Sequence, residues 1–120
     1  MIQPLKITFS TSKGDNVYVI KPPSVGQFYD IEVNKQLFGK GVYGAVIKTN
    51  TLNAQHAADM IDIEAHLRVL MPQEFFDDLK TESFQDLGIE DYNRIRKTYV
   101  NDFLPWWKQI QDLLKLEDDA

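Results

Sequence analysis

The 120-residue chain contains no cysteine, and this absence removes several classes of site at once. Disulfide bonds, thiolate metal centres and cysteine nucleophiles are all excluded. A chain without cysteine also fits a reducing compartment, where disulfides are rare. We therefore expect an apolar core that holds the fold without covalent cross-links.

Long apolar runs are missing as well. No segment approaches the roughly 20 apolar residues that a helix needs to span a bilayer. The first residues, Met1–Lys6, do not combine a basic region with an apolar run and a cleavage site, so no signal peptide is expected. The sequence thus predicts a cytoplasmic protein without a membrane partner.

Positive charge is scarce, because 13 Lys and Arg face 18 Asp and Glu, for a net charge of −5. Domains that bind nucleic acid usually present a basic face. The basic residues here are scattered, apart from Arg94, Arg96 and Lys97. We therefore expect no nucleic-acid partner.

What the chain does contain is typical of one globular domain. Hydrophobic residues make up 43% of it, and there is no linker, repeat or low-complexity segment. We predict a single domain over residues 1–120, in the α+β class and mainly α. It would comprise a β-hairpin over 1–21, a helical region of about five helices over 24–116, and an acidic tail over 117–120.

The expected hairpin pairs two strands at the start of the chain. Residues 5–10 alternate apolar and polar side chains, and residues 16–21 are β-branched and aromatic. The segment 11–15 between them is rich in turn-forming residues and includes a glycine suited to positive φ. Two strands alone are marginal in water, so the hairpin must pack on other elements or pair with a partner.

Helices are expected over most of the remaining chain. Ser24 and Gln27 have capping-box spacing and predict a helix over 24–38 that Gly39 ends. Residues 40–50 fit a strand or a short helix, and we favour the helix. The other predicted elements are a central helix opened by Asn53 and ending at Met71, a short helix over 72–80, a loop over 83–88 with apolar anchors, and a helix from Ile89.

The last helix contains Pro105, which either kinks it or restarts it, because proline lacks the backbone donor. Tyr99, Phe103, Trp106 and Trp107 cluster around this proline. Core packing is the ordinary explanation for such rings. Adjacent tryptophans, however, point about 100° apart on a helix, so we expect one of them to be exposed. All four are candidate partner-binding residues, since tryptophan is enriched at binding hot spots.

Two patterns resemble catalytic or ligand sites, and both have simpler explanations. Asp59, Asp62 and His66 share one stripe of the central helix, but the Glu-x-x-His pairs of helical metal sites are absent. The Gly39-x-Gly41-x-x-Gly44 spacing matches a dinucleotide loop but follows a predicted helix rather than a strand. We expect no enzyme, no metal and no cofactor.

The order of elements resembles the small tail-assembly chaperones and virion-assembly proteins of tailed bacteriophages. The matching residues are Pro22, Pro23, Ser24, Phe28, Ile31, Glu32, Asp59, Asp62, Leu70, Pro72, Tyr99, Phe103, Pro105 and Trp106. The resemblance implies a small, acidic, cofactor-free protein of the host cytoplasm. It also implies self-association and the escort of a tail or tape-measure protein.

The sequence therefore predicts a non-enzymatic protein-binding protein. Its expected contact surface comprises the aromatic cluster and an exposed hairpin edge, at 5–10 or 17–21. One alternative is a stable structural subunit of a virion or other assembly. Another is an acidic inhibitor or DNA mimic, which would need acids aligned on one face.

Overall fold

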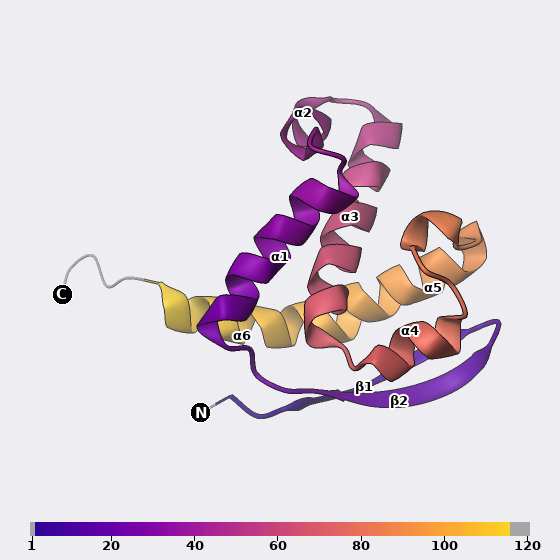
Figure 1. Cartoon of the computed structure of the whole chain (residues 1–120). Helices are drawn as coiled ribbons and strands as arrows, with labels where there is room; N and C mark the ends of the chain where they lie inside the picture. The colour runs from indigo at the N-terminus through magenta and orange to yellow at the C-terminus, as the bar shows by residue number, and fades with distance from the viewer. Residues whose placement is uncertain (1, 116–120) are drawn as a thin grey trace. The chain divides into compact units, whose positions relative to one another are not determined.

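The computed structural model describes residues 2–115, and the predicted acidic tail over 117–120 lies outside them. Within this range the chain is mainly helical. A two-stranded antiparallel hairpin is followed by five helices, if the contiguous helical segments between Ile89 and Leu114 are taken as one (Figure 1). The predicted fold class is confirmed.

Backbone contacts divide the chain into two compact units. The hairpin unit comprises Met1–Pro22, Pro72–Thr81 and Leu87–Ala120, of which 2–22, 72–81 and 87–115 are described. The helical unit comprises Pro23–Met71 and Glu82–Asp86. The single domain expected over 1–120 stays a prediction.

The hairpin is formed by β1 (Leu5–Thr11) and β2 (Gly14–Ile20), which pair in register from Leu5↔Ile20 to Thr11↔Gly14. The predicted strands are confirmed, although the connecting turn is shorter than expected. Only residues 12–13 connect the strands. Gly14 adopts a φ of 118°, which explains why glycine follows this tight turn.

The inward face of the hairpin carries the apolar side chains predicted by its period of two. Ile7, Phe9, Tyr18 and Ile20 are buried. They pack with α4 (Gln73–Leu79), whose Phe75 ring lies 4.8 Å from that of Phe9. This short helix agrees with the prediction over 72–80, with Pro72 as its N-cap.

A long helical run completes the hairpin unit. It consists of α5 (Ile89–Thr98), the π-helical turn η2 (Tyr99–Phe103) and α6 (Leu104–Leu114). The Leu104 N–H donates to the carbonyl of Tyr99, five residues earlier. Pro105 lies in the first turn of α6, where its missing donor has little cost. Phe103 and Leu104 keep right-handed helical dihedral angles, so the helix continues past Pro105 and the expected restart does not occur.

In the helical unit, α1 (Val25–Phe38) begins where the sequence predicts. The Ser24 N–H donates to the Gln27 side chain at 2.9 Å, as in a capping box. Residues 43–48 form α2 (Tyr43–Lys48), so the helix favoured for 40–50 is confirmed. Gly39 ends α1 with a φ of −82°, so its role is not the left-handed cap expected of it.

The central helix of this unit is α3 (Leu52–Leu70), which contacts both α1 and α2. Its N-cap is Thr51 rather than Asn53, because the Thr51 hydroxyl accepts the N–H of Ala54 at 3.2 Å. Threonine and asparagine are both favoured at the N-cap position. The local sequence therefore does not show which of the two residues begins the helix.

The segment after α4 returns to the helical unit as the 3₁₀ turn η1 (Phe84–Asp86). The Phe84 N–H donates to the buried carboxylate of Glu64 at 3.2 Å. This bond and Arg68, whose Nε lies 3.4 Å from Glu64, satisfy an acid inside the unit. Burial raises the pKa of Glu64. The expected loop over 83–88 is thus anchored by one helical turn.

Candidate functional site

The four aromatic side chains expected at a contact surface are all buried. Tyr99, Phe103, Trp106 and Trp107 expose between 0 and 6% of their surface. The Phe103 ring stacks on Tyr99 with centroids 4.7 Å apart and on Trp107 at 5.6 Å. These rings therefore contribute to the core.

The expectation that one tryptophan would be exposed is wrong. Trp106 points toward the segment before β1, and its indole N–H donates to the Gln3 carbonyl at 2.7 Å. Trp107 points elsewhere and stacks on Phe103. The two tryptophan side chains point in different directions, as predicted, but each of them packs against another part of the fold. Partner binding by these rings stays a prediction and would require their covering segments to move.

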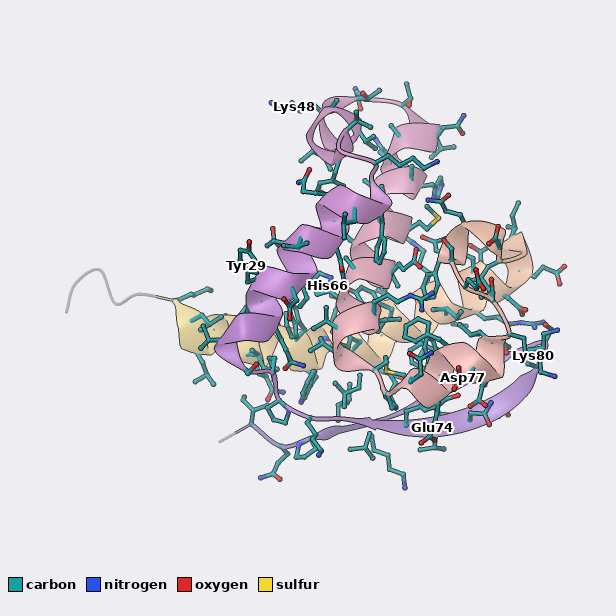
Figure 2. The ribbon with its side chains drawn as sticks, viewed as in Figure 1. Tyr29, Lys48, His66, Glu74, Asp77 and Lys80 are labelled. Atoms are coloured by element: carbon teal, nitrogen blue, oxygen red, sulfur yellow. The ribbon has the colours of Figure 1, made fainter. Side chains whose placement is uncertain are left out.

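The outer face of α1 is the largest apolar feature that the sequence analysis did not single out. Four side chains spaced four residues apart project from it: Val25, Tyr29, Val33 and Leu37. They are 84, 72, 37 and 65% exposed. Tyr29 extends from α1 on the side away from α3 (Figure 2). We call this set the α1 stripe.

The opposite face of α1 packs within the helical unit. Ile31 is buried, and Asn34 donates to the Ala65 carbonyl of α3 at 3.4 Å. A helix with apolar side chains on both faces is usually covered on both. The i, i+4 spacing of Val25, Tyr29, Val33 and Leu37 was the available signal. This spacing identifies an exposed face only after the residues of α1 that face the core, such as Ile31, are known.

Two acidic side chains border the α1 stripe. Asp30 and Glu32 are both exposed. Glu32 forms an ion pair with Lys35 at 2.9 Å, but the Lys35 side chain is only 19% exposed and lies toward α3. The solvent-facing borders of the α1 stripe are therefore acidic.

The stripe of Asp59, Asp62 and His66 faces the α1–α2 side of the helical unit. The Tyr43 hydroxyl donates to Asp62 at 2.5 Å, and His66 Nδ1 donates to the Asp62 carbonyl at 2.6 Å. Burial is the main reason why the pKa of His66 is lowered and that of Tyr43 raised. Within residues 2–115 no three His, Asp or Glu side chains gather as metal ligands. Asp62 and His66 instead belong to a polar seam inside the unit.

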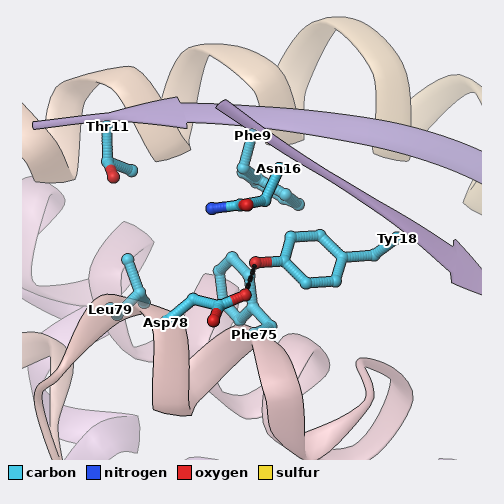
Figure 3. A pocket seen from close by; sticks show the side chains of 7 residues that line it. All are labelled: Phe9, Thr11, Asn16, Tyr18, Phe75, Asp78 and Leu79. Carbon is cyan, nitrogen blue, oxygen red and sulfur yellow. Dashed lines mark hydrogen bonds between the residues drawn. The ribbon is translucent and has the colours of Figure 1, made fainter. Parts of the chain in front are cut away.

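A small cavity of about 10 Å³ lies between the hairpin and α4 (Figure 3). The Tyr18 hydroxyl donates to Asp78 at 2.6 Å across it. Burial, aided by this bond, raises the pKa of the Tyr18 phenol well above its ordinary value. The volume admits about one water molecule and no substrate. This cavity is a packing feature of the hairpin unit.

A larger, open groove of about 350 Å³ runs between β1 and the α5–η2 helix. Its lining is polar and comprises Ser10, Arg94, Lys97, Thr98, Asn101 and Asp102. Arg94 and Lys97 belong to the one basic cluster found in the sequence. Its volume is at the lower end of the range of ligand pockets. We call it the β1–α5 groove.

The hairpin also exposes an edge, as the sequence predicts. Val17 and Val19 of β2 are half exposed. In a hairpin closed by a two-residue turn, these non-hydrogen-bonded positions direct their backbone groups away from β1. A partner strand would pair with these outward backbone groups, and binding at this edge stays a prediction.

No part of the chain described between residues 2 and 115 forms a helix long and apolar enough to cross a membrane. The α1 stripe is the surface in this range with the greatest exposed apolar content on one element. No protein-family model, curated protein or solved structure matches this chain.

Proposed function

We propose that this protein is a non-enzymatic binding protein whose α1 stripe receives a helix of a partner protein. The observation that carries the proposal is the exposure of Val25, Tyr29 and Leu37 on a helix that already has a buried face. Side chains repeating at i and i+4 form a ridge that fits the groove of a second helix. Helix-in-groove recognition uses the same spacing of anchors.

The apolar side chains of this face would supply part of the free energy of binding. Covering side chains such as Val25, Tyr29 and Leu37 contributes on the order of 1.5–3 kcal/mol each. Association and side-chain ordering oppose this gain, so only part of it appears as affinity. Tyr29 is expected to dominate, because tyrosine is enriched among hot-spot residues.

The charge of the borders favours one kind of partner helix. Asp30 and Glu32 complement Lys or Arg beside the apolar anchors of that helix. A second copy of α1 in antiparallel contact would instead place Asp30 near Asp30 of the other copy, which is repulsive. We therefore assign the α1 stripe to an amphipathic helix with basic borders on a different protein.

The biological role that we propose is that of a tail-assembly chaperone of a tailed bacteriophage. Its support is the resemblance in element order, together with an acidic chain that presents an apolar helix face. Escort of a helical tail or tape-measure protein requires such a face, because the escorted helices would otherwise aggregate. A stable virion subunit remains the alternative role, and the two differ in whether the protein persists in purified particles.

The test is an affinity purification from the native host, followed by reconstitution of the binary complex from purified components. Tyr29→Asp and Leu37→Asp place a charge on the α1 stripe without touching the core. Leu113→Asp is the matched control, since Leu113 is 69% exposed on α6. Binding is measured by calorimetry, and the contacted segment by hydrogen exchange.

We expect both α1 variants to weaken binding at least about tenfold, which corresponds to roughly 1.4 kcal/mol, while Leu113→Asp leaves it unchanged. Protection from exchange should be confined to α1 in this protein and to a helix in the partner. Binding that survives both α1 variants would overturn the proposal. So would a dimer of this chain that Tyr29→Asp dissociates, because it would assign the α1 stripe to a second copy.

A further inference from the structure

A second recognition site is built into the hairpin unit, at the β1–α5 groove. We infer that this groove binds an extended segment of a protein in which an acidic and a basic side chain lie two residues apart, with the carboxylate held by Arg94 and Lys97. The inference rests on the proposed protein-binding function but involves a different unit and different chemistry from the α1 stripe. The two can therefore fail independently.

Arg94 is held in place by a chain of contacts that begins in the hairpin turn. The Ser12 N–H and hydroxyl donate to the two carboxylate oxygens of Asp91, at 2.8 and 2.5 Å. Asp91 in turn accepts Arg94 Nη1 at 3.3 Å. One nitrogen of the guanidinium is thus engaged, while its side chain remains 50% exposed beside the groove. A donor fixed before binding loses less entropy when a carboxylate arrives.

The same contacts fix the groove walls. Ser10 lines the groove from β1, and it lies two residues before Ser12, which is tied to α5 through Asp91. β1 and α5 are also in direct contact. The separation of the two walls therefore depends on the Ser12–Asp91 pair. This arrangement indicates a preformed groove.

Lys97 does not stabilise the C-terminal end of a helix. Positive side chains in the last turn of a helix ordinarily stabilise its free carbonyls. The helix continues from α5 through η2 into α6, however, so Lys97 lies in the interior of one helical run. Lys97 is exposed, and no ion pair engages its ammonium within the described chain. Arg94 and Lys97 therefore favour an anionic group at their end of the groove, and Asp102 favours a cationic group at the other end.

The remaining lining residues select the form of that ligand. Ser10, Thr98 and Asn101 offer hydroxyl and amide groups that can pair with a peptide backbone. Asp102 lies five residues beyond Lys97, roughly 8 Å along the helix and about two to three residues of an extended peptide. An extended ligand with a carboxylate at one position and a basic side chain two residues away, on the same face, would satisfy both ends. A ligand with a second acid there would be repelled.

The π-helical turn adds to this assignment. Thr98, Asn101 and Asp102 lie at or beside η2, and π turns inside α-helices occur frequently at functional sites. Asn101 and Asp102 both line the groove from this turn. The core does not require these two side chains, since both are exposed.

The experiment titrates the full chain with three synthetic peptides and follows amide shifts by NMR. Their central sequences are Glu-Ser-Lys, Gln-Ser-Lys and Glu-Ser-Glu, and inorganic phosphate is a fourth ligand. We expect the first peptide to bind best and to shift the amides of Ser10, Lys97 and Asn101. Lys97→Glu should weaken it at least about tenfold, as removal of a paired charge does. Lys108→Glu, an exposed charge reversal on α6, is the control.

A charge exchange separates recognition from simple electrostatic attraction. Asp102→Lys should reverse the preference, so that Glu-Ser-Glu binds more tightly than Glu-Ser-Lys. Peptide binding that ignores Lys97→Glu would overturn the inference. Phosphate binding without peptide binding would also overturn it and indicate an anion site. Loss of partner binding in the α1 variants, with intact peptide binding, would separate this site from the proposed function.

Discussion

The indole N–H of Trp106 donates a hydrogen bond of 2.7 Å to the backbone carbonyl of Gln3, 103 residues earlier in the chain. This bond ties the segment before β1 to the first turn of α6. It helps to bury one of the two tryptophans, of which the sequence predicted that one would be exposed. The core of the hairpin unit is thus closed by the two ends of the described chain.

Truncation of either tryptophan should therefore lower stability. Trp107→Ala removes a ring stacked on Phe103, and loss of a large buried aromatic costs about 3–5 kcal/mol. Trp106→Phe retains a ring but loses the bond to Gln3, for about 0.5–1.5 kcal/mol plus a packing term. Urea denaturation measures both. Unchanged stability of Trp107→Ala would contradict the assignment of this ring to the core.

Asp91 should make the hairpin unit sensitive to acid. Its hydrogen bonds from Ser12, followed in importance by the Arg94 charge, hold the pKa of the Asp91 carboxyl below its usual value. A depressed pKa stabilises the fold above the unfolded pKa, near 3.9, and this contribution is lost as pH falls through the folded pKa. Unfolding of wild type and Asp91→Asn should therefore differ at pH 7 and converge below about pH 3.

Ser12→Ala is the control for Asp91→Asn, because it removes one of the two hydrogen-bond donors to Asp91, the Ser12 hydroxyl, and keeps the carboxylate. It should cost about 0.5–1.5 kcal/mol at pH 7, less than Asp91→Asn, since the Ser12 N–H still donates. Parallel stability curves for wild type and Asp91→Asn down to pH 2 would contradict the prediction.

His66 should make the helical unit less stable in mild acid. Burial lowers the pKa of its imidazole, with the Asp62 carbonyl accepting Nδ1–H in the neutral form. A lowered histidine pKa leaves stability complete above the unfolded value of about 6.5, and stability declines as pH falls below it. His66→Gln should flatten the decline in stability below about pH 6.5.

The carboxyl group of Glu64 also contributes to the pH dependence of stability. Burial raises the pKa of Glu64, so its own contribution decreases as pH rises through that pKa, opposite in sign to that of His66. The difference between wild type and His66→Gln isolates the histidine, because Glu64 is present in both. An identical pH dependence of the two proteins would show that His66 does not titrate differently on unfolding.

Two glycines of the helical unit should respond oppositely to alanine. A Cβ at Gly39 would lie 2.8 Å from the Tyr43 Cβ and 2.9 Å from the Lys35 carbonyl, so Gly39→Ala should cost about 1–3 kcal/mol. A Cβ at Gly44 meets no atom within 4 Å, and alanine there should stabilise α2 by up to about 1 kcal/mol. Thermal unfolding of the two variants should shift in opposite directions. Equal shifts would contradict the close approach at Gly39.

The sequence was sufficient for elements whose signals are local. The alternation in 5–10 and the capping box at Ser24 each depend on residues within one or two turns. The structure places β1 and α1 accordingly. The N-cap of α3 was assigned to Asn53 because Thr51, two residues earlier, is an equally good cap.

The candidate surfaces required the tertiary structure. The burial of Trp106 depends on Gln3, and no spacing in the sequence relates two residues so far apart. The α1 stripe was equally hidden, because Tyr29 and Ile31 look alike until one of them is found to be buried. The β1–α5 groove combines Ser10 with a basic cluster that the sequence showed only as three neighbouring charges.

The chain by itself thus determined its fold class, its lack of thiol chemistry and its acidic balance, because these follow from composition and short-range periodicity. Only the tertiary structure decided which apolar side chains are covered and which polar ones converge. Whether a side chain is buried depends on which other elements pack against it. The helical periodicity of the sequence indicates only the direction in which the side chain points. For Trp106 and Trp107 two different directions both led into the core, whereas on α1 an equally apolar face stayed exposed.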